Sequence, residues 1–190
     1  MVGVILFRAQ PFHNGHLYMV KTAFNDCMKN NCDLYIFIGS ADKFGTVRNP
    51  IPISFRYELV KGSLQETFSE QELKHIHIYP LNDLNDETCN DYNWGRYFFM
   101  KVFALTKDSN MSIYYSGDPN VLLSWFDEEE RWCLNFIFVD RFDGITATQV
   151  RNIITTPNMS SNALLSLVPN YVYNHREEIK KYILKSMERK

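Results

Sequence analysis

An α/β fold, with a mostly parallel β-sheet and helices on both faces, is predicted by two features of the sequence. Five short apolar segments rich in β-branched and aromatic residues recur at fairly even intervals, as the strands of one sheet do. Between them lie segments whose apolar residues are three and four positions apart, the spacing of amphipathic helices. Strands that alternate with helices are joined by right-handed crossovers and run parallel. The expected order is therefore a β-α unit repeated five times.

Each expected strand is an apolar run of strand length, and the clearest helices have an apolar stripe. The stripe of the first helix starts at Leu17 and reaches Met28, and that of the second starts at Phe55 and reaches Phe68. The strands are expected at residues 2–7, 34–38, 76–79, 113–115 and 136–139, and further helices at 94–105, 119–126, 146–154 and 170–190.

We expect one domain that spans residues 1–190 and ends in a helical segment from about residue 160. A chain of 190 residues with 45% hydrophobic content suits one full core, and a division into two domains would be strained. No linker rich in Pro, Gly or Ser divides the chain. The acidic run Asp127–Glu130 is expected to be a solvated turn.

Composition excludes several classes of protein. Charged residues make up 22% of the chain, and no apolar run approaches the roughly 18 residues that a membrane span needs. The apolar start of the chain is expected to be a strand, because no cleavage site of a signal peptide follows it. The four cysteines form no CxxC pair, so we expect reduced, mostly buried thiols. These features favour a cytoplasmic protein without a membrane partner.

Charge is unevenly distributed along the chain, although the net charge is only −2. Residues 1–60 carry six Lys or Arg against four Asp or Glu, and residues 141–190 carry eight against four. Residues 70–140 carry five against thirteen. A nucleic-acid binder usually has a continuous basic face, so no nucleic-acid partner is expected. The pattern instead favours a local anion site built from both ends of the chain.

Two histidines flank a glycine directly after the first strand, where the first helix begins. His13, Gly15 and His16 form an HxGH pattern. Ligands of parallel α/β sheets bind at the carboxyl ends of the strands, and the free N–H groups of a helix N-terminus favour anions. One histidine at such a position would more often only cap a turn. The paired pattern favours a phosphate site to which the imidazoles add hydrogen bonds.

A second helix N-terminus follows the last strand. Thr146 and Gln149 have the spacing of a capping box, and Ile145 and Val150 are placed as its hydrophobic staple. A helix should therefore begin at Thr146. Arg151 lies near the first turn of that helix, where it could reach an anion. A surface arginine paired with a nearby aspartate is equally consistent with this position.

Together the two segments resemble the signatures of the nucleotidylyltransferase superfamily, an HxGH near the N-terminus and an ISxxxxR-like motif near the C-terminus. Within it, the chain is most similar to archaeal-type nicotinamide mononucleotide adenylyltransferases, whose opening reads like GRFQPxHxGH. Phe7 and Ala9 depart from that opening, and Thr146 and Ala147 replace a more usual Ser and Gly. The likeness covers nearly the whole chain and includes the segments 38–41, 48–50 with Arg56, 79–83, 90–94, 115–119 and 166–169.

The resemblance implies a Rossmann-like nucleotidylyltransferase fold and an enzyme that makes NAD. The phosphate of nicotinamide mononucleotide would attack the α-phosphorus of ATP and release pyrophosphate. In such a transfer the enzyme mainly aligns the substrates and neutralises charge, so no covalent nucleophile is required. Mg²⁺ bridging the phosphates is expected as the cofactor, with no metal ligand from protein side chains. Since the family is commonly oligomeric, the resemblance also implies a homo-oligomer.

Site residues follow from the resemblance by position. The residues assigned to catalysis are Arg8, His13, His16 and Arg151. The residues expected to bind ATP are Gln10, Gly15, Arg48, Gly117, Asp118 and Thr146. The residues expected to bind the acceptor are Gly39, Ser40, Asp83, Asp91 and Trp94. The indole of Trp94 could stack on the pyridinium ring, while plain helix packing is the alternative.

Two other functions remain open. A sibling transferase, such as a pantetheine-phosphate adenylyltransferase or a cytidylyltransferase, would share both motifs, because they contact only the triphosphate. The segments around Arg48 and Trp94 favour the pyridine nucleotide as acceptor. A non-catalytic nucleotide sensor could keep the fold without turnover, but the intact histidines and Arg151 argue against it. A dehydrogenase is disfavoured, since no GxGxxG follows the first strand.

Overall fold

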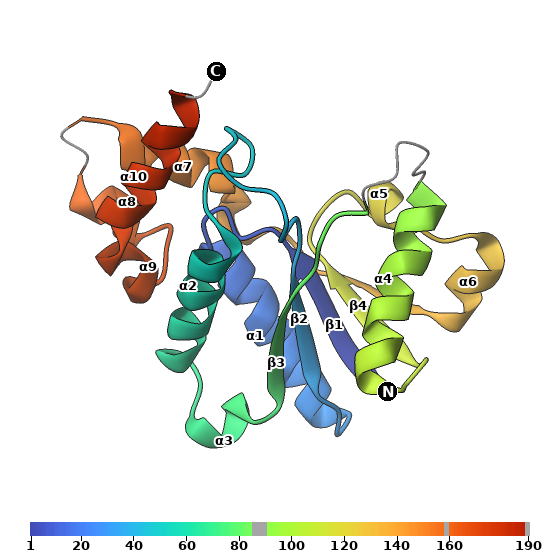
Figure 1. Cartoon of the computed structure of the whole chain (residues 1–190). Helices are drawn as coiled ribbons and strands as arrows, with labels where there is room; N and C mark the ends of the chain where they lie inside the picture. Colours follow the sequence, from blue (N-terminus) through green and yellow to red (C-terminus); the bar gives the residue numbers. More distant parts are fainter. Residues whose placement is uncertain (85–90, 158–159, 189–190) are drawn as a thin grey trace.

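The computed structural model describes residues 1–84, 91–157 and 160–188. A five-stranded parallel sheet forms its centre, with the strand order β3-β2-β1-β4-β5 (Figure 1). The strands are β1 (Val2–Phe7), β2 (Leu34–Ile38), β3 (Ile76–Pro80), β4 (Met111–Tyr115) and β5 (Asn135–Phe138). The predicted parallel α/β sheet is therefore confirmed, and each strand begins and ends within two residues of the expected position.

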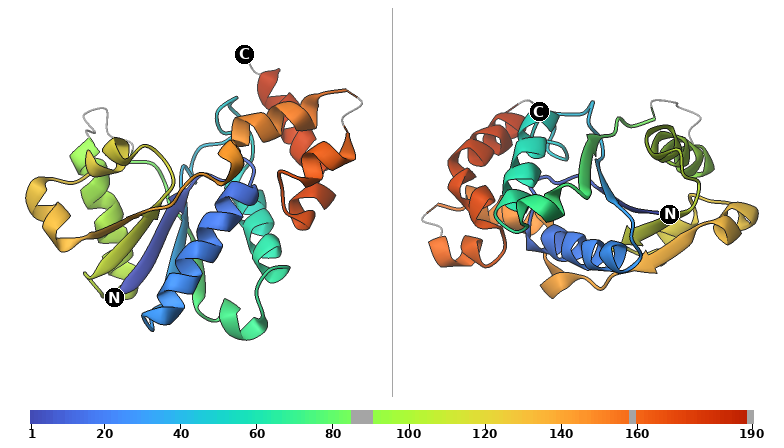
Figure 2. Two further views of the ribbon diagram at one scale, coloured as in Figure 1. Left: turned by 180° about the vertical axis from the view of Figure 1, so that it is seen from behind. Right: turned by 90° about the horizontal axis from the view of Figure 1, so that it is seen from below.

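Helices cover both faces of the sheet, as predicted (Figure 2). One face carries α1 (Asn14–Lys29) and α2 (Ile53–Gln65), followed in the chain by the short α3 (Glu70–Leu73). The other face carries α4 (Asp91–Thr106), α5 (Pro119–Leu123) and α6 (Glu128–Cys133). A 3₁₀ turn (Phe142–Gly144) precedes the C-terminal helices, which lie beside α2 and are α7 (Ala147–Thr155), α8 (Ser161–Leu165), α9 (Asn170–Asn174) and α10 (Arg176–Met187).

The two faces of the sheet form separate hydrophobic cores. Successive side chains of a strand point to opposite faces, so Val4 packs with α4 and α5 while Ile5 packs with α1 and α2. The core on the α1 side also includes apolar residues of α7 to α10. Burial of these side chains fixes the C-terminal helices against the first half of the chain, which is why residue 151 can lie near residue 10.

Two local predictions were wrong. The acidic run starting at Asp127 begins α6 and is not a solvated turn, because the Asp127 carboxylate accepts from the Glu130 N–H (2.8 Å) and the Glu130 carboxylate accepts from the Asp127 N–H (3.1 Å). Such a reciprocal pair caps a helix N-terminus. The expected helix at 170–190 is interrupted at His175, whose backbone (φ −97°, ψ 12°) separates α9 from α10.

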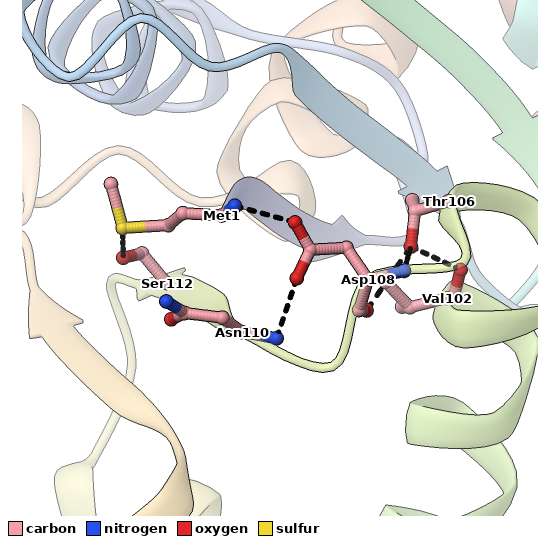
Figure 3. A network of polar contacts seen from close by, with 6 residues as sticks. All are labelled: Met1, Val102, Thr106, Asp108, Asn110 and Ser112. Atoms are coloured by element: carbon pink, nitrogen blue, oxygen red, sulfur yellow. Dashed lines mark hydrogen bonds and ion pairs between the residues drawn. The ribbon is translucent and has the colours of Figure 1, made fainter.

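The N-terminal end of the sheet is held by a polar network around Asp108 (Figure 3). Its carboxylate pairs with the Met1 ammonium and accepts from the Asn110 N–H (2.8 Å). Its backbone N–H donates to Thr106 Oγ1 (3.1 Å). These contacts join the start of β1 to the start of β4, so the carboxyl ends of the same strands emerge together at the opposite edge. Within the described ranges, no helix combines the length and apolar character needed to cross a membrane.

Candidate active site

Three adjoining cavities lie at the carboxyl edge of the sheet. We call them the large pocket (about 670 Å³), the central pocket (about 450 Å³) and the small pocket (about 200 Å³). Arg8 and Arg48 line both the large and the central pocket, while His13, His16 and Thr146 line both the central and the small pocket. The shared walls make one continuous crevice, located where parallel α/β sheets bind their ligands.

The two histidines of the HxGH segment stack at the N-terminus of α1. His13 is the N-cap of this helix, its backbone N–H donates to His16 Nδ1 (3.3 Å), and the ring centroids are 3.7 Å apart. Burial lowers the pKa of His13 to about 4 and holds the pKa of His16 well below its usual range. Both imidazoles are therefore neutral at pH 7 and can donate hydrogen bonds to an anion without carrying charge.

Gly15 leaves room for this stack. A Cβ at position 15 would lie 3.1 Å from two atoms of the His13 ring, which is tighter than ordinary van der Waals contact. The neighbouring His13 Nδ1 is buried and has no hydrogen-bond partner within the described part of the chain.

Three arginines from distant parts of the chain supply the positive charge of the central pocket: Arg8, Arg48 and Arg151. Burial lowers the pKa of Arg8, and the nearby positive charge of Arg48 lowers it further. Burial and the charge of Arg8 have the same effect on the pKa of Arg151. Mutual repulsion between these cations is relieved when an anion lies between them, so the pocket favours a group with several negative charges.

Arg151 is fixed from both sides. Its Nη1 donates to the Gln10 carbonyl (2.7 Å) and its Nη2 donates to Thr148 Oγ1 (3.1 Å). The two ends of the chain thus meet, as predicted, and among the described residues no aspartate pairs with Arg151. Thr146 is the N-cap of α7, as predicted, since its Oγ1 accepts from the Gln149 N–H (3.1 Å).

The large pocket combines aromatic rings with a polar rim. Ser40 Oγ donates to the Asp83 carboxylate (3.0 Å), and the Asp83 N–H donates to Asp42 Oδ1 (2.8 Å). The aromatic wall of this pocket contains Trp94 and Trp125, which meet edge to face with centroids 6.1 Å apart. Such a wall can receive a flat ring, and the adjacent arginines can receive its attached phosphate.

The structure brings together most of the residues predicted for the site, with four differences. Gln10 lines the central pocket, but its amide is engaged with the backbone of Ile51, accepting at 3.0 Å and donating at 3.2 Å. Gly117 and Asp118 do not line the three pockets; Asp118 instead caps α5 by accepting from the Asn120 N–H (2.9 Å). Asp91 is the first residue of α4, and its side chain lies outside the described residues.

Sequence reasoning missed several residues of the crevice. The large pocket also contains Lys43, Tyr115 and Trp125, and the small pocket contains Ser116 and Arg141. Tyr115 is the last residue of β4, and the other four residues lie in connecting segments that have no recognisable spacing. The predicted strand and the resemblance over residues 115–119 both point to Tyr115 and Ser116, because residues at the carboxyl end of a parallel strand lie at the ligand-binding edge.

A parallel sheet with a basic pocket at its carboxyl edge, lined by three arginines and two histidines, defines the class as a nucleotide-binding α/β protein. The family model for cytidylyltransferase-like proteins matches residues 8–153, a range that contains both Arg8 and Arg151. The chain belongs to this cytidylyltransferase-like family and, within it, to the archaeal-type nicotinamide-nucleotide adenylyltransferases.

Curated relatives support the narrower assignment. The nicotinamide-nucleotide adenylyltransferase of Methanospirillum hungatei is 32% identical over 147 residues, which cover 77% of this chain and 72% of the relative. That of Thermococcus kodakarensis is 26% identical over 178 residues, 94% of this chain and 83% of the relative. The predicted family is therefore confirmed.

Among solved structures, the fold is similar to that of a bifunctional NMN adenylyltransferase/ADP ribose pyrophosphatase from Francisella tularensis. The TM-score is 0.73 at 21% sequence identity, and the match covers 99% of this chain. It covers 52% of the other, so the chain spans about half the length of that structure. This likeness supports the Rossmann-like nucleotidylyltransferase fold.

Proposed function

We propose that this protein is a nicotinamide-nucleotide adenylyltransferase, which transfers AMP from ATP to nicotinamide mononucleotide and yields NAD and pyrophosphate. The observation that carries the proposal is the convergence of Arg8 and Arg151 with the paired histidines in the central pocket, next to an aromatic pocket of suitable size. The predicted enzyme class agrees with that of the curated relatives.

The central pocket is proposed to hold the triphosphate of ATP. A phosphate oxygen of the acceptor forms a bond to the α-phosphorus, and the bond from that phosphorus to the bridging oxygen of pyrophosphate breaks. Charge grows on the pyrophosphate as it leaves. Arg8, Arg48 and Arg151 neutralise that charge, and the neutral imidazoles of His13 and His16 donate hydrogen bonds to it. These donors are already in place, so little reorganisation accompanies the reaction.

The large pocket is proposed to hold the acceptor. Trp94 offers an aromatic face to the pyridinium ring, which is both flat and cationic, and Trp125 supports the indole edge to face. Arg8 and Arg48 stand between this pocket and the central one. The acceptor phosphate would therefore lie beside the α-phosphorus, as direct displacement requires.

Mg²⁺ is proposed to enter as a complex with the phosphates of ATP, where it would neutralise negative charge on their oxygens. Within residues 1–84, 91–157 and 160–188, no group of three His, Cys, Asp or Glu side chains is arranged to hold a metal ion. The chain's contribution is then to bind the same phosphates through Arg8, Arg48 and Arg151. This arrangement fits an ion that arrives with its substrate.

An end-point assay tests the proposal directly. Purified protein is incubated with ATP, Mg²⁺ and one of three acceptors, nicotinamide mononucleotide, nicotinic acid mononucleotide or 4′-phosphopantetheine, and released pyrophosphate is measured. We expect turnover with the pyridine nucleotides and none with phosphopantetheine or when CTP replaces ATP. Turnover only with phosphopantetheine or CTP would identify a sibling transferase. Nucleotide binding without turnover would identify a sensor.

A further inference from the structure

Arg56 stands out because it is a charged side chain buried beneath the crevice. It lies in the first turn of α2 and is 0% exposed, and no other Lys, Arg, Asp or Glu within the described ranges is classed as buried. It does not line any of the three pockets. Its role must therefore be exerted through the groups that it contacts.

The guanidinium of Arg56 donates to three backbone carbonyls at the ends of two strands. Nη1 donates to the carbonyls of Arg8 (2.7 Å) and Gly39 (2.8 Å), and Nη2 donates to that of Ser40 (2.8 Å). Arg8 directly follows β1, and Gly39 and Ser40 directly follow β2. One planar guanidinium thus connects, through hydrogen bonds, the turn after β1 and the turn after β2.

The backbone of these two turns has an unfavourable conformation, which the hydrogen bonds from Arg56 stabilise. Ala9, which follows Arg8, and Ser40 have φ angles of 51° and 49°, in the left-handed region that residues other than glycine rarely adopt. Burial lowers the pKa of Arg56 to about 10, so the side chain remains charged at pH 7. The described residues place no carboxylate within ion-pair distance, and its Nε has no partner there. Burial of a cation is costly, and both the nearby negative charge of Asp83 and the three carbonyl bonds offset that cost.

The two turns differ in the part of the crevice that they line. Arg8 lines both the central and the large pocket, whereas Gly39 and Ser40 line the large pocket alone. We infer that Arg56 is a positioning residue that fixes the triphosphate-binding turn relative to the acceptor-binding turn, so that the two substrates are aligned for transfer. This inference rests on the proposed function, in which ATP and the acceptor occupy the central and the large pocket.

Loss of substrate alignment lowers kcat, whereas loss of substrate binding raises the dissociation constants. A displacement of about 1 Å between reacting groups can lower a rate by about 100-fold while each substrate still binds. Loss of Arg56 should therefore reduce kcat by about 10- to 100-fold. The dissociation constants for ATP and for nicotinamide mononucleotide, each measured alone, should change by less than about 3-fold.

Two variants with different chemistry test this. Arg56→Lys keeps the charge but loses the planar fork, and Arg56→Met keeps the length and removes the buried charge. Arg176→Lys serves as the matched control, because Arg176 lies on α10, packs over the Tyr173 ring and lines none of the three pockets. Circular dichroism and thermal unfolding establish the folded fraction, calorimetry gives both affinities, and steady-state kinetics give kcat per folded molecule.

We expect both Arg56 variants to fold and bind each substrate while kcat falls, and the control to keep full activity. Normal kcat in the folded variants, or a loss of affinity as large as the loss of rate, would overturn the inference. Failure of both variants to fold would also overturn it, since Arg56 would then serve the fold alone. If wild-type protein transfers AMP only to a different acceptor, the proposed function fails, and the same comparison is made with that acceptor.

Discussion

At the scale of single residues, the site works through neutral and charged donors with different tasks. Desolvation keeps His13 and His16 uncharged, while the arginines stay charged in spite of burial and mutual repulsion. A neutral donor interacts weakly with a bound anion but more strongly as charge develops on that anion. The histidines should therefore affect the rate more than substrate affinity, and the arginines should affect both.

Replacement of His16 by alanine tests this division. His16→Ala should lower kcat by roughly 100-fold or more and change the Michaelis constant for ATP much less, as expected for removal of one transition-state donor. Steady-state kinetics at saturating acceptor measure both constants. His75→Ala is the control, because His75 pairs with Asp33 (2.8 Å) just before β3, at the far edge of the sheet. A folded His16→Ala protein with near-normal kcat would remove His16 from the mechanism.

Replacement of Trp94 tests the acceptor pocket. Trp94→Ala should weaken binding of nicotinamide mononucleotide by about 1–3 kcal/mol, the range for aromatic stacking on a base, and leave ATP binding nearly unchanged. Calorimetry with each ligand measures this. Trp132→Ala is a suitable control, since that indole is 90% exposed on α6. Equal losses for both ligands would mean that Trp94 only packs the helix and does not contact the acceptor.

At the scale of elements, two helix N-termini converge on the central pocket. α1 begins after His13 and α7 begins after Thr146, and both capping residues line that pocket. Free N–H groups and the helix dipole favour an anion at each terminus. The caps therefore have two tasks: each begins its helix, and each forms part of the wall of the pocket.

The cap of α7 can be tested by stability alone. Thr146→Ala removes the oxygen that accepts from the Gln149 N–H, and should lower the free energy of unfolding by about 1 kcal/mol. Thr146→Ser keeps that oxygen and should preserve most of the stability. Urea unfolding followed by circular dichroism gives both values. Equal stability of the alanine and serine variants would show that the cap contributes nothing measurable to α7.

At the scale of the whole molecule, the fold joins residues 143 positions apart in one phosphate site. Arg8 follows the central strand β1. Arg151 lies on α7, and its bond to the Gln10 carbonyl holds its guanidinium next to the turn that contains Arg8. From the positive ends of the chain, Arg8 and Arg48 of the first and Arg151 of the second line the same pocket. The proximity of Arg8 and Arg151 implies that these two arginines act on one ligand.

A double-mutant cycle measures that coupling. Arg8→Ala and Arg151→Ala should each weaken ATP and pyrophosphate binding, and should affect AMP much less because it lacks the outer phosphates. Residues that share a ligand typically couple by about 0.5–3 kcal/mol, so the two effects on ATP affinity should not add. Calorimetry on the four proteins gives the coupling energy, with folding checked by circular dichroism. Strict additivity, or equal losses for AMP and ATP, would contradict a shared triphosphate site.

The positions of the strands, a helix start at the HxGH segment, a helix start at Thr146 and the family could all be predicted from the sequence, because these depend on local spacing and on short motifs. The contacts of each side chain, by contrast, depend on how the folded chain packs. Gln10 and Arg56 both lie in segments that resemble the adenylyltransferase family. In the structure, however, Gln10 bonds to the backbone of Ile51 and Arg56 donates to three backbone carbonyls. The aromatic wall at Trp125 arises likewise from packing between distant segments. Such contacts depend on where the whole chain places its loops, and neither spacing nor hydrophobic period contains that information.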